Sequence, residues 1–194
     1  MMSTFKYPPV LAFNFDFNYN IILNAYHDLC DMGYGNRLLA TTPEKIVRDN
    51  DEDKAKHCKN NILNLNGNVL EKPEAQYIYS EVDRFCEVIK SKNYNTHLIS
   101  YDDEDFVLWH LDKRPVGYGP ETTKVNIMLT GESFTTFKCG DYPYRNGLVD
   151  VTRREHMYDN RGQPYKAVLR IQIKDYNYDE MYEIISGNKN FSMA

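Results

Sequence analysis

The sequence lacks several features that would assign a protein to a class at once. Its four cysteines are scattered and no Cys-x-x-Cys pair occurs, which argues against a cysteine-based zinc site. No stretch approaches the roughly 20 apolar residues of a membrane-spanning helix. The first residues carry no basic segment followed by an apolar run, so we expect no signal peptide. We therefore expect reduced thiols, no membrane partner and a cytoplasmic location.

Basic tracts and repeats are also missing. The net charge is -5 over 194 residues and no tract of Lys and Arg stands out, so nucleic acid is not an expected partner. No internal repeat or low-complexity segment divides the chain. The length suits one domain with a substantial core, and we expect a single domain over residues 1–194.

The first half of the chain has helical periodicity. Apolar residues spaced by three and four predict helices within residues 19–36 and 72–93. Residues 42–63 begin with a good helix start, Thr-Pro-Glu, but their middle is very polar, which indicates an exposed helix or an ordered loop. We expect residues 1–94 to form a mainly helical layer.

The second half changes to the pattern of strands. Short segments rich in β-branched and aromatic residues, separated by Gly, Pro, Asp and Asn, lie at 96–102, 105–112, 124–130, 133–140, 147–152 and 165–173. Strands and helices do not alternate, which disfavours a doubly wound parallel sheet. The pattern predicts an α+β fold in which residues 95–194 form a β-sandwich or barrel core. Gly131 and Gly147 are predicted to be turn glycines.

His110 and Asp112 are the first candidates for chemistry. In a strand alternate side chains share a face, so Phe106, Leu108, His110 and Asp112 are expected on one face. The only tryptophan, Trp109, is then expected to pack against the helical layer. Alone, His-x-Asp is a common triplet that a polar strand surface explains as well as a metal site.

A second histidine strengthens the metal interpretation. His156 follows far enough along the chain for intervening strands to return it to the same place. Two histidines and one carboxylate form the facial triad that suits ferrous iron and leaves coordination positions open.

The order of these motifs resembles a known family. The segments WHLD, KVNIML and GLVDVTRREHMYDNRGQPYKAVLRI are similar to the core of the Fe(II)/2-oxoglutarate-dependent dioxygenases. Within it, EHMYDNRGQPYKAVLRI is most like the aspartyl/asparaginyl β-hydroxylase branch. The resemblance covers roughly residues 97–174 and implies a double-stranded β-helix, the jelly-roll of cupins, as the core. It also implies that His110, Asp112 and His156 bind the metal.

The resemblance further implies which residues bind the co-substrate. Lys166 stands ten positions after His156, where the family has a basic residue, usually Arg, that pairs with the distal carboxylate of 2-oxoglutarate. Arg170, expected on the same strand face, is the rival. Lys124 and Asn126 stand where the branch has residues that help to bind the co-substrate, although an exposed lysine on an edge strand explains Lys124 equally well.

Two further sets of residues are expected around the site. Lys113 and Arg114 lie in a long loop, which is either a lid that recognises substrate or a solvated turn. Four tyrosines are candidates for the entrance: Tyr101, Tyr118, Tyr142 and Tyr144. No catalytic side chain is implied beyond the metal ligands.

The implied function is the hydroxylation of an unactivated C–H bond. It uses Fe(II), 2-oxoglutarate and O2, releases succinate and CO2, and by resemblance acts on a protein or peptide side chain. Two alternatives stay open, because one fold hosts many functions. One is an oxygenase that acts on a free amino acid, another small-molecule metabolite or a nucleobase. The other is a non-catalytic cupin-like binding protein or a structural zinc site.

Overall fold

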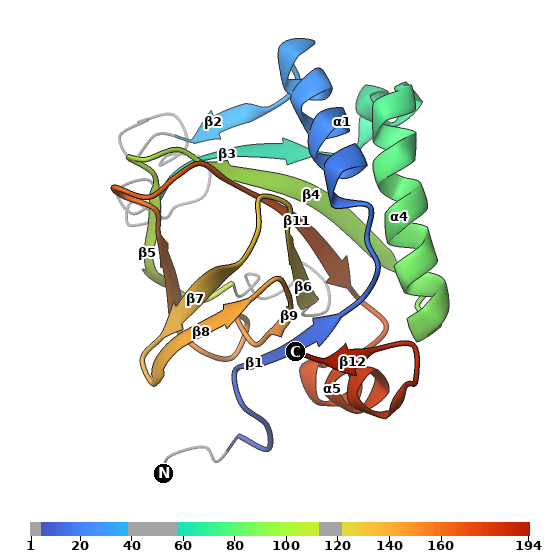
Figure 1. The fold of residues 1–194 in the computed structure, drawn as a ribbon, viewed down its shortest axis with the longest axis vertical. Helices are drawn as coiled ribbons and strands as arrows, with labels where there is room; N and C mark the ends of the chain where they lie inside the picture. The colour runs from blue at the N-terminus through green and yellow to red at the C-terminus, as the bar shows by residue number, and fades with distance from the viewer. Residues whose placement is uncertain (1–4, 39–57, 113–121) are drawn as a thin grey trace, which may run out of the picture.

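Twelve strands form one connected antiparallel sheet that curls on itself (Figure 1). The structure is a computed structural model that describes residues 5–38, 58–112 and 122–194. The strands are β1 (Val10–Asn14), β2 (Asn36–Leu38), β3 (Cys58–Asn64), β4 (Tyr94–Tyr101), β5 (Phe106–His110), β6 (Thr123–Met128), β7 (Ser133–Phe137), β8 (Gly140–Tyr144), β9 (Asn146–Val149), β10 (His156–Asp159), β11 (Lys166–Ile173) and β12 (Ser192–Met193). Their order in space is β12-β1-β9-β6-β11-β4-β3-β5-β10-β7-β8, with β2 beside β3.

Helices flank the larger part of this sheet. They are α1 (Tyr19–Asp31), the 3-10 helix η1 (Gly67–Glu71), α4 (Pro73–Ile89) and α5 (Tyr178–Gly187). The two predicted helices, α1 and α4, are confirmed. Pro73 and Glu74 lie in the first turn of α4, where both residue types favour a helix start. Helix α5, which was not predicted, begins with a capping box between Asn177 and Glu180. No helix in the described part of the chain is long and apolar enough to cross a bilayer.

The sheet has an outer and an inner face with separate cores. On the outer face of the larger half, Leu98 and Leu169 pack with Phe85 of α4. On the inner face, Ile99 of β4 packs with Phe137 of β7, which belongs to the smaller half formed by β5, β10, β7 and β8. Two antiparallel half-sheets that face each other in this way form the predicted jelly-roll with helices on one side.

The N-terminal half contributes more to the sheet than its sequence predicts. β1, β2 and β3 all lie before residue 95, within the segment expected to be mainly helical. β3 covers the end of the stretch 42–63, where we expected a helix or loop, and the rest of that stretch lies outside the described residues. Residues of β3 pair with both β4 and β5, so tertiary pairing outweighs a polar local sequence.

Trp109 does not occupy its predicted place. Its side chain is 42% exposed. The reason is that β5 belongs to the smaller half-sheet, away from α1 and α4, so none of the helices in the described part of the chain covers its outer face (Figure 1).

Candidate metal centre

Three metal-binding side chains meet where β5 ends and β10 begins. His110 and His156 are direct partners across these two strands, and their ring centroids are 4.1 Å apart. Asp112 lies just beyond β5, where its backbone N–H donates to the carbonyl of Val151 at 2.9 Å. One ligand atom from each of the three side chains lies within 4.8 Å of the others. The structure therefore brings together the three residues that the sequence predicted.

Strand alternation does not explain the position of His110, and the prediction that Phe106 and His110 share a face is wrong. Val107 pairs with Tyr158, whereas His110 pairs with His156, so β5 has one residue more than β10 between the two pairs. Val107 packs with the inner core, which places Phe106 on the opposite face. Phe106 and His110 thus do not share a face, and a β-bulge instead of plain alternation turns His110 inward.

The hydrogen bonds of the two rings leave the metal-facing nitrogens free to bind. His110 Nδ1 lies 2.7 Å from the carbonyl of Leu108, and His156 Nδ1 lies 3.4 Å from that of Arg154. A carbonyl only accepts, so these contacts assign the ring proton to Nδ1 and a lone pair to Nε2. The Nε2 atoms of His110 and His156 lie 3.2 and 4.0 Å from Asp112 Oδ1. This arrangement is typical of histidines that bind a metal.

The charges of the site also suit a cation. Burial lowers the pKa of His156 to about 3, although nearby Asp112 opposes the shift, so its imidazole is neutral at neutral pH. Burial alone would raise the pKa of Asp112, but Arg170 and the two histidines outweigh it and hold that pKa well below its usual range. The donor set is therefore a neutral imidazole and a carboxylate anion in the states that bind metals.

The predicted co-substrate residues divide into two groups. Arg170 Nη1 donates to Asp112 Oδ2 at 3.0 Å, and Arg170 Nε donates to Asn126 Oδ1 at 2.9 Å. Lys124 is buried and lies two residues from Asn126, on the same face of β6. These residues line the inner face beside the triad. The interpretation of Lys124 as an exposed edge lysine is wrong, because β6 lies between β9 and β11.

Lys166 lies apart from this group. It opens β11, four residues before Arg170, and its Nζ donates to the carbonyl of Glu132 at 3.3 Å. Lys113 and Arg114, the predicted lid residues, lie outside the described residues, as does Tyr118.

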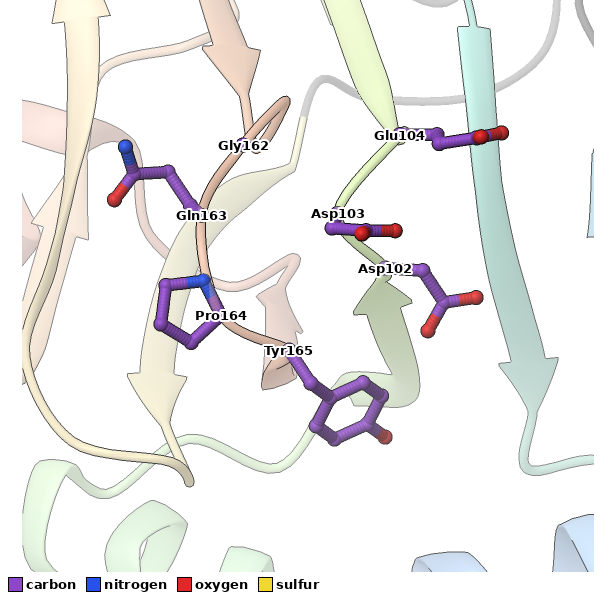
Figure 2. Close-up of a pocket in the computed structure, with 7 residues that line it drawn as sticks. All are labelled: Asp102, Asp103, Glu104, Gly162, Gln163, Pro164 and Tyr165. Carbon is purple, nitrogen blue, oxygen red and sulfur yellow. The ribbon is translucent and has the colours of Figure 1, made fainter.

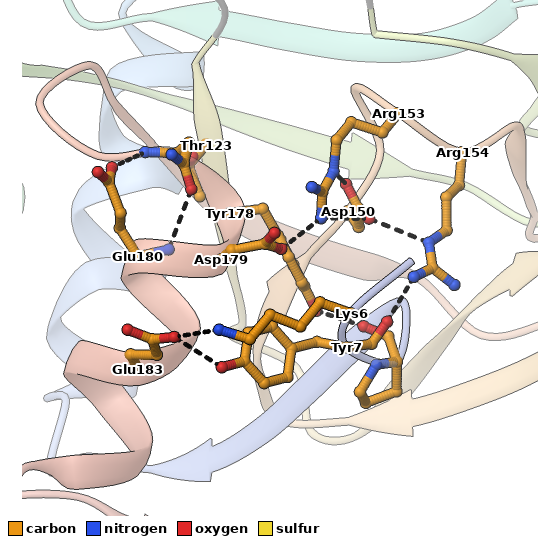
Figure 3. A network of polar contacts seen from close by, with 12 residues as sticks. Lys6, Tyr7, Thr123, Asp150, Arg153, Arg154, Tyr178, Asp179, Glu180 and Glu183 are labelled. Carbon is orange, nitrogen blue, oxygen red and sulfur yellow. Dashed lines mark hydrogen bonds and ion pairs between the residues drawn. The ribbon is translucent and has the colours of Figure 1, made fainter. Parts of the chain in front are cut away.

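The loop between β9 and β10, residues 150–155, supplies two of the backbone carbonyls that contact the triad. Its shape depends on Asp150, whose side chain is completely buried. The carboxylate accepts from Arg153 Nε at 2.8 Å, from Arg153 Nη2 at 2.9 Å and from Arg154 Nε at 3.0 Å (Figure 3). Arg153 also donates to Asp179 of α5 at 2.8 Å. This cluster was not predicted, although the sequence carries a signal for it in the two arginines directly before Glu155 and His156.

A surface hollow of about 710 Å³ lies elsewhere (Figure 2). It is formed by Asp102, Asp103 and Glu104 before β5 and by Gly162, Gln163, Pro164 and Tyr165 after β10. These segments are at the opposite ends of β5 and β10 from His110 and His156, so the hollow is separate from the triad.

Comparisons with known proteins give a match in structure only. No protein-family model matches the sequence, and no curated protein does. A prolyl hydroxylase from Trichoplax adhaerens, in complex with a hypoxia inducible factor peptide fragment, superposes with a TM-score of 0.61 at 10% identity, over 90% of this chain and 86% of that one. A Pseudomonas putida prolyl-4-hydroxylase gives 0.52 at 10% identity, over 86% and 94%. A truncated viral collagen prolyl hydroxylase from Paramecium Bursaria Chlorella virus-1 gives 0.50 at 11%, over 91% and 98%.

The chain shares its fold with these prolyl hydroxylases. Within this fold His110, Asp112 and His156 form the candidate metal-binding triad. The predicted jelly-roll fold is thereby confirmed. The three matched structures are prolyl hydroxylases, so the finer placement in the aspartyl/asparaginyl branch stays a prediction.

Proposed function

We propose that the protein is an Fe(II)- and 2-oxoglutarate-dependent dioxygenase that hydroxylates an unactivated C–H bond of a protein or peptide side chain, with release of succinate and CO2. The observation that carries the proposal is the triad: two imidazole nitrogens and one carboxylate oxygen within 4.8 Å of one another, on the inner face of a hydroxylase fold.

The residues present fit ferrous iron. Two histidines and one carboxylate suit this ion, and the three ligands found among the described residues leave coordination positions open. Iron bound there would supply the oxidative chemistry of the reaction. The protein contributes the ligand geometry. His110 and His156 are held by backbone carbonyls, and Asp112 by the carbonyl of Val151.

Lys166 is our candidate for the anchor of 2-oxoglutarate. Its position ten residues after His156 matches the family, and its amine bonds only a backbone carbonyl among the described contacts. A lysine there neutralises the distal carboxylate as a point charge. Arg170, Lys124 and Asn126 form the alternative anchor. Against Arg170 stands its ion pair with Asp112, which it would have to leave in order to reach the co-substrate.

A protein or peptide is the proposed substrate class. In support, the matched Trichoplax adhaerens enzyme is a prolyl hydroxylase in complex with a peptide fragment. The likeness to the aspartyl/asparaginyl branch points to an Asp or Asn side chain, whereas the structural match points to proline. A free amino acid, a small metabolite or a nucleobase is the second candidate, because the same iron centre serves all of these.

The test begins with the purified protein, Fe(II) and 2-oxoglutarate. Without oxygen we expect a weak visible charge-transfer band, and with oxygen the formation of succinate. His110→Ala and Asp112→Ala should abolish both signals. If the wild-type protein shows neither the band nor succinate, the proposed dioxygenase activity is refuted and a cupin-like binding protein is favoured. Mass spectrometry of candidate peptides and metabolites, which detects the gain of one oxygen, then identifies the substrate.

A further inference from the structure

The two oxygens of Asp112 have different partners. Oδ1 faces the metal-binding nitrogens of His110 and His156, whereas Oδ2 accepts from Arg170 Nη1 at 3.0 Å. A carboxylate can bind a metal through one oxygen or through both. With Oδ2 held by a guanidinium, only Oδ1 is presented to the metal.

Arg170 is itself held by a chain of buried hydrogen bonds. Its Nε donates to Asn126 Oδ1 at 2.9 Å, and Asn126 Nδ2 donates to the hydroxyl of Tyr144 at 3.0 Å. The hydroxyls of Tyr144 and Thr135 lie 2.6 Å apart. Asn126, Tyr144 and Thr135 are each at most 4% exposed. Because Arg has only donors, it fixes the orientation of the Asn126 amide, and the amide in turn fixes the guanidinium.

The strand register holds this chain together. Arg170 of β11 is the direct partner of Asn126 of β6, and Asn126 is the partner of Gly147 of β9. A Cβ atom on Gly147 would lie 2.7 Å from the ring of Tyr144. The missing side chain at Gly147 therefore makes the space in which Tyr144 reaches Asn126.

We propose that Arg170 is a positioning residue, supported by Asn126 and Tyr144, that occupies Oδ2 of Asp112 and restricts this carboxylate to a single metal bond through Oδ1. One bond from each of three residues leaves one face of an octahedral ion open, which a chelating keto acid and O2 both require. A second bond from Asp112 would close one of these positions. The inference rests on the proposed metal site, and it assigns Arg170 to the metal side of the site, leaving Lys166 for the co-substrate.

The test compares Arg170→Met with Lys166→Met, since each removes one cation from the same face of β11. Calorimetric titration with Mn(II), a redox-stable probe, measures metal binding, and titration with 2-oxoglutarate at saturating Mn(II) measures co-substrate binding. We expect Arg170→Met to weaken Mn(II) binding by about ten- to a hundredfold, the usual effect of losing a group that orients a metal ligand. Arg170→Lys should recover part of the loss, and Lys166→Met should weaken only 2-oxoglutarate binding.

Two results would overturn the inference. One is weakened 2-oxoglutarate binding by Arg170→Met with Mn(II) binding of wild-type strength and a single Asp112 oxygen on the metal in the crystal structure of that variant, which would make Arg170 the co-substrate anchor. The other is a crystal structure of the Mn(II)-loaded wild-type protein in which both oxygens of Asp112 bind the metal. If Arg170→Met does not fold, Asn126→Leu tests the same support, with the same expected loss of Mn(II) binding. Wild-type protein that binds Mn(II) but not 2-oxoglutarate would refute the proposed function and leave this inference standing.

Discussion

At the scale of single residues, Gly147 shows how an absent side chain shapes the interior. It lies within β9 and does not have a positive φ, unlike Gly131 with φ 107°. Our prediction of a turn glycine is therefore right for Gly131 and wrong for Gly147, whose role is to make room for the ring of Tyr144. A sequence pattern cannot distinguish the two roles, because the ring that requires the space is placed by tertiary structure.

Gly147→Ala is expected to destabilise the protein by about 1–3 kcal/mol, the range for overpacking a well-filled core. The new methyl group must displace the Tyr144 ring, which its own hydrogen bonds hold in place. Gly187→Ala is the matched control. No atom lies within 4 Å of its Cβ position at the end of α5, so a small stabilisation is expected. Urea unfolding measures both, and equal stability of the two variants would contradict the packing argument.

His97 is expected to make the stability of the protein depend on pH. Burial, and then Arg170 and Lys124, lower its pKa to about 3, whereas an unfolded histidine has a pKa of about 6.5. Between these values the unfolded chain binds a proton that the folded protein does not, so stability falls as the pH falls below about 6.5. The slope for one such group is about 1.4 kcal/mol per pH unit.

We expect His97→Gln to reduce the slope of unfolding free energy against pH by about 1.4 kcal/mol per pH unit, the contribution of one proton. Urea unfolding at pH 5, 6 and 7 measures this slope. His156 contributes with the same sign in both proteins, so some dependence remains. Above about pH 7.5 the stabilities of the variant and the wild type should run parallel. Identical slopes below pH 6.5 would show that His97 takes up a proton in the folded protein.

At the scale of elements, the sequence predicted six strands and two helices that the structure confirms. Two of the missed strands, β8 and β10, have weak local signals. β8 contains Pro143, which only an edge strand tolerates, and β10 has four residues, too few for a visible alternation. Likewise, His110 and His156 could be chosen from the order of motifs, but not the β-bulge in β5 that brings their rings together.

The β9–β10 loop is the element on which the metal centre most depends. Asp150→Asn removes a buried anion and leaves Arg154 without its carboxylate partner, a change that typically costs about 3–5 kcal/mol. Arg153 keeps Asp179, so the lower part of that range is expected. Since the loop carbonyls also contact the triad, Mn(II) binding should weaken in the folded variant.

Glu183→Gln is the control for that experiment. Its carboxylate, on α5, accepts from Lys6 and Tyr7 at the exposed side of the same network and not from the arginines of the loop (Figure 3). It should change neither stability nor Mn(II) binding appreciably. A lower free energy of unfolding for Asp150→Asn, with unchanged Mn(II) affinity, would show that the loop supports the fold but not the metal centre.

At the scale of the whole molecule, the triad joins parts of the chain that are far apart in sequence. His110 and Asp112 come from the end of β5, and His156 from the start of β10, next to the loop that α5 and the N-terminal segment hold in place. A metal ion at this point would cross-link the end of β5 to the start of β10. Metal binding is therefore expected to stabilise the entire fold.

Removal of the metal should lower the melting temperature of the protein. A ligand at one hundred times its Kd that binds only the folded state stabilises it by about 2.7 kcal/mol. We expect Mn(II) to raise the Tm, a chelator to reverse the change, and Asp112→Asn to abolish it, because the amide lacks the anionic oxygen that binds the ion. Scanning calorimetry with and without Mn(II) provides the measurement. A Tm shift of equal size in Asp112→Asn would place the bound ion elsewhere. The first alternative would be the carboxylates of Asp102, Asp103 and Glu104, which line the separate hollow (Figure 2).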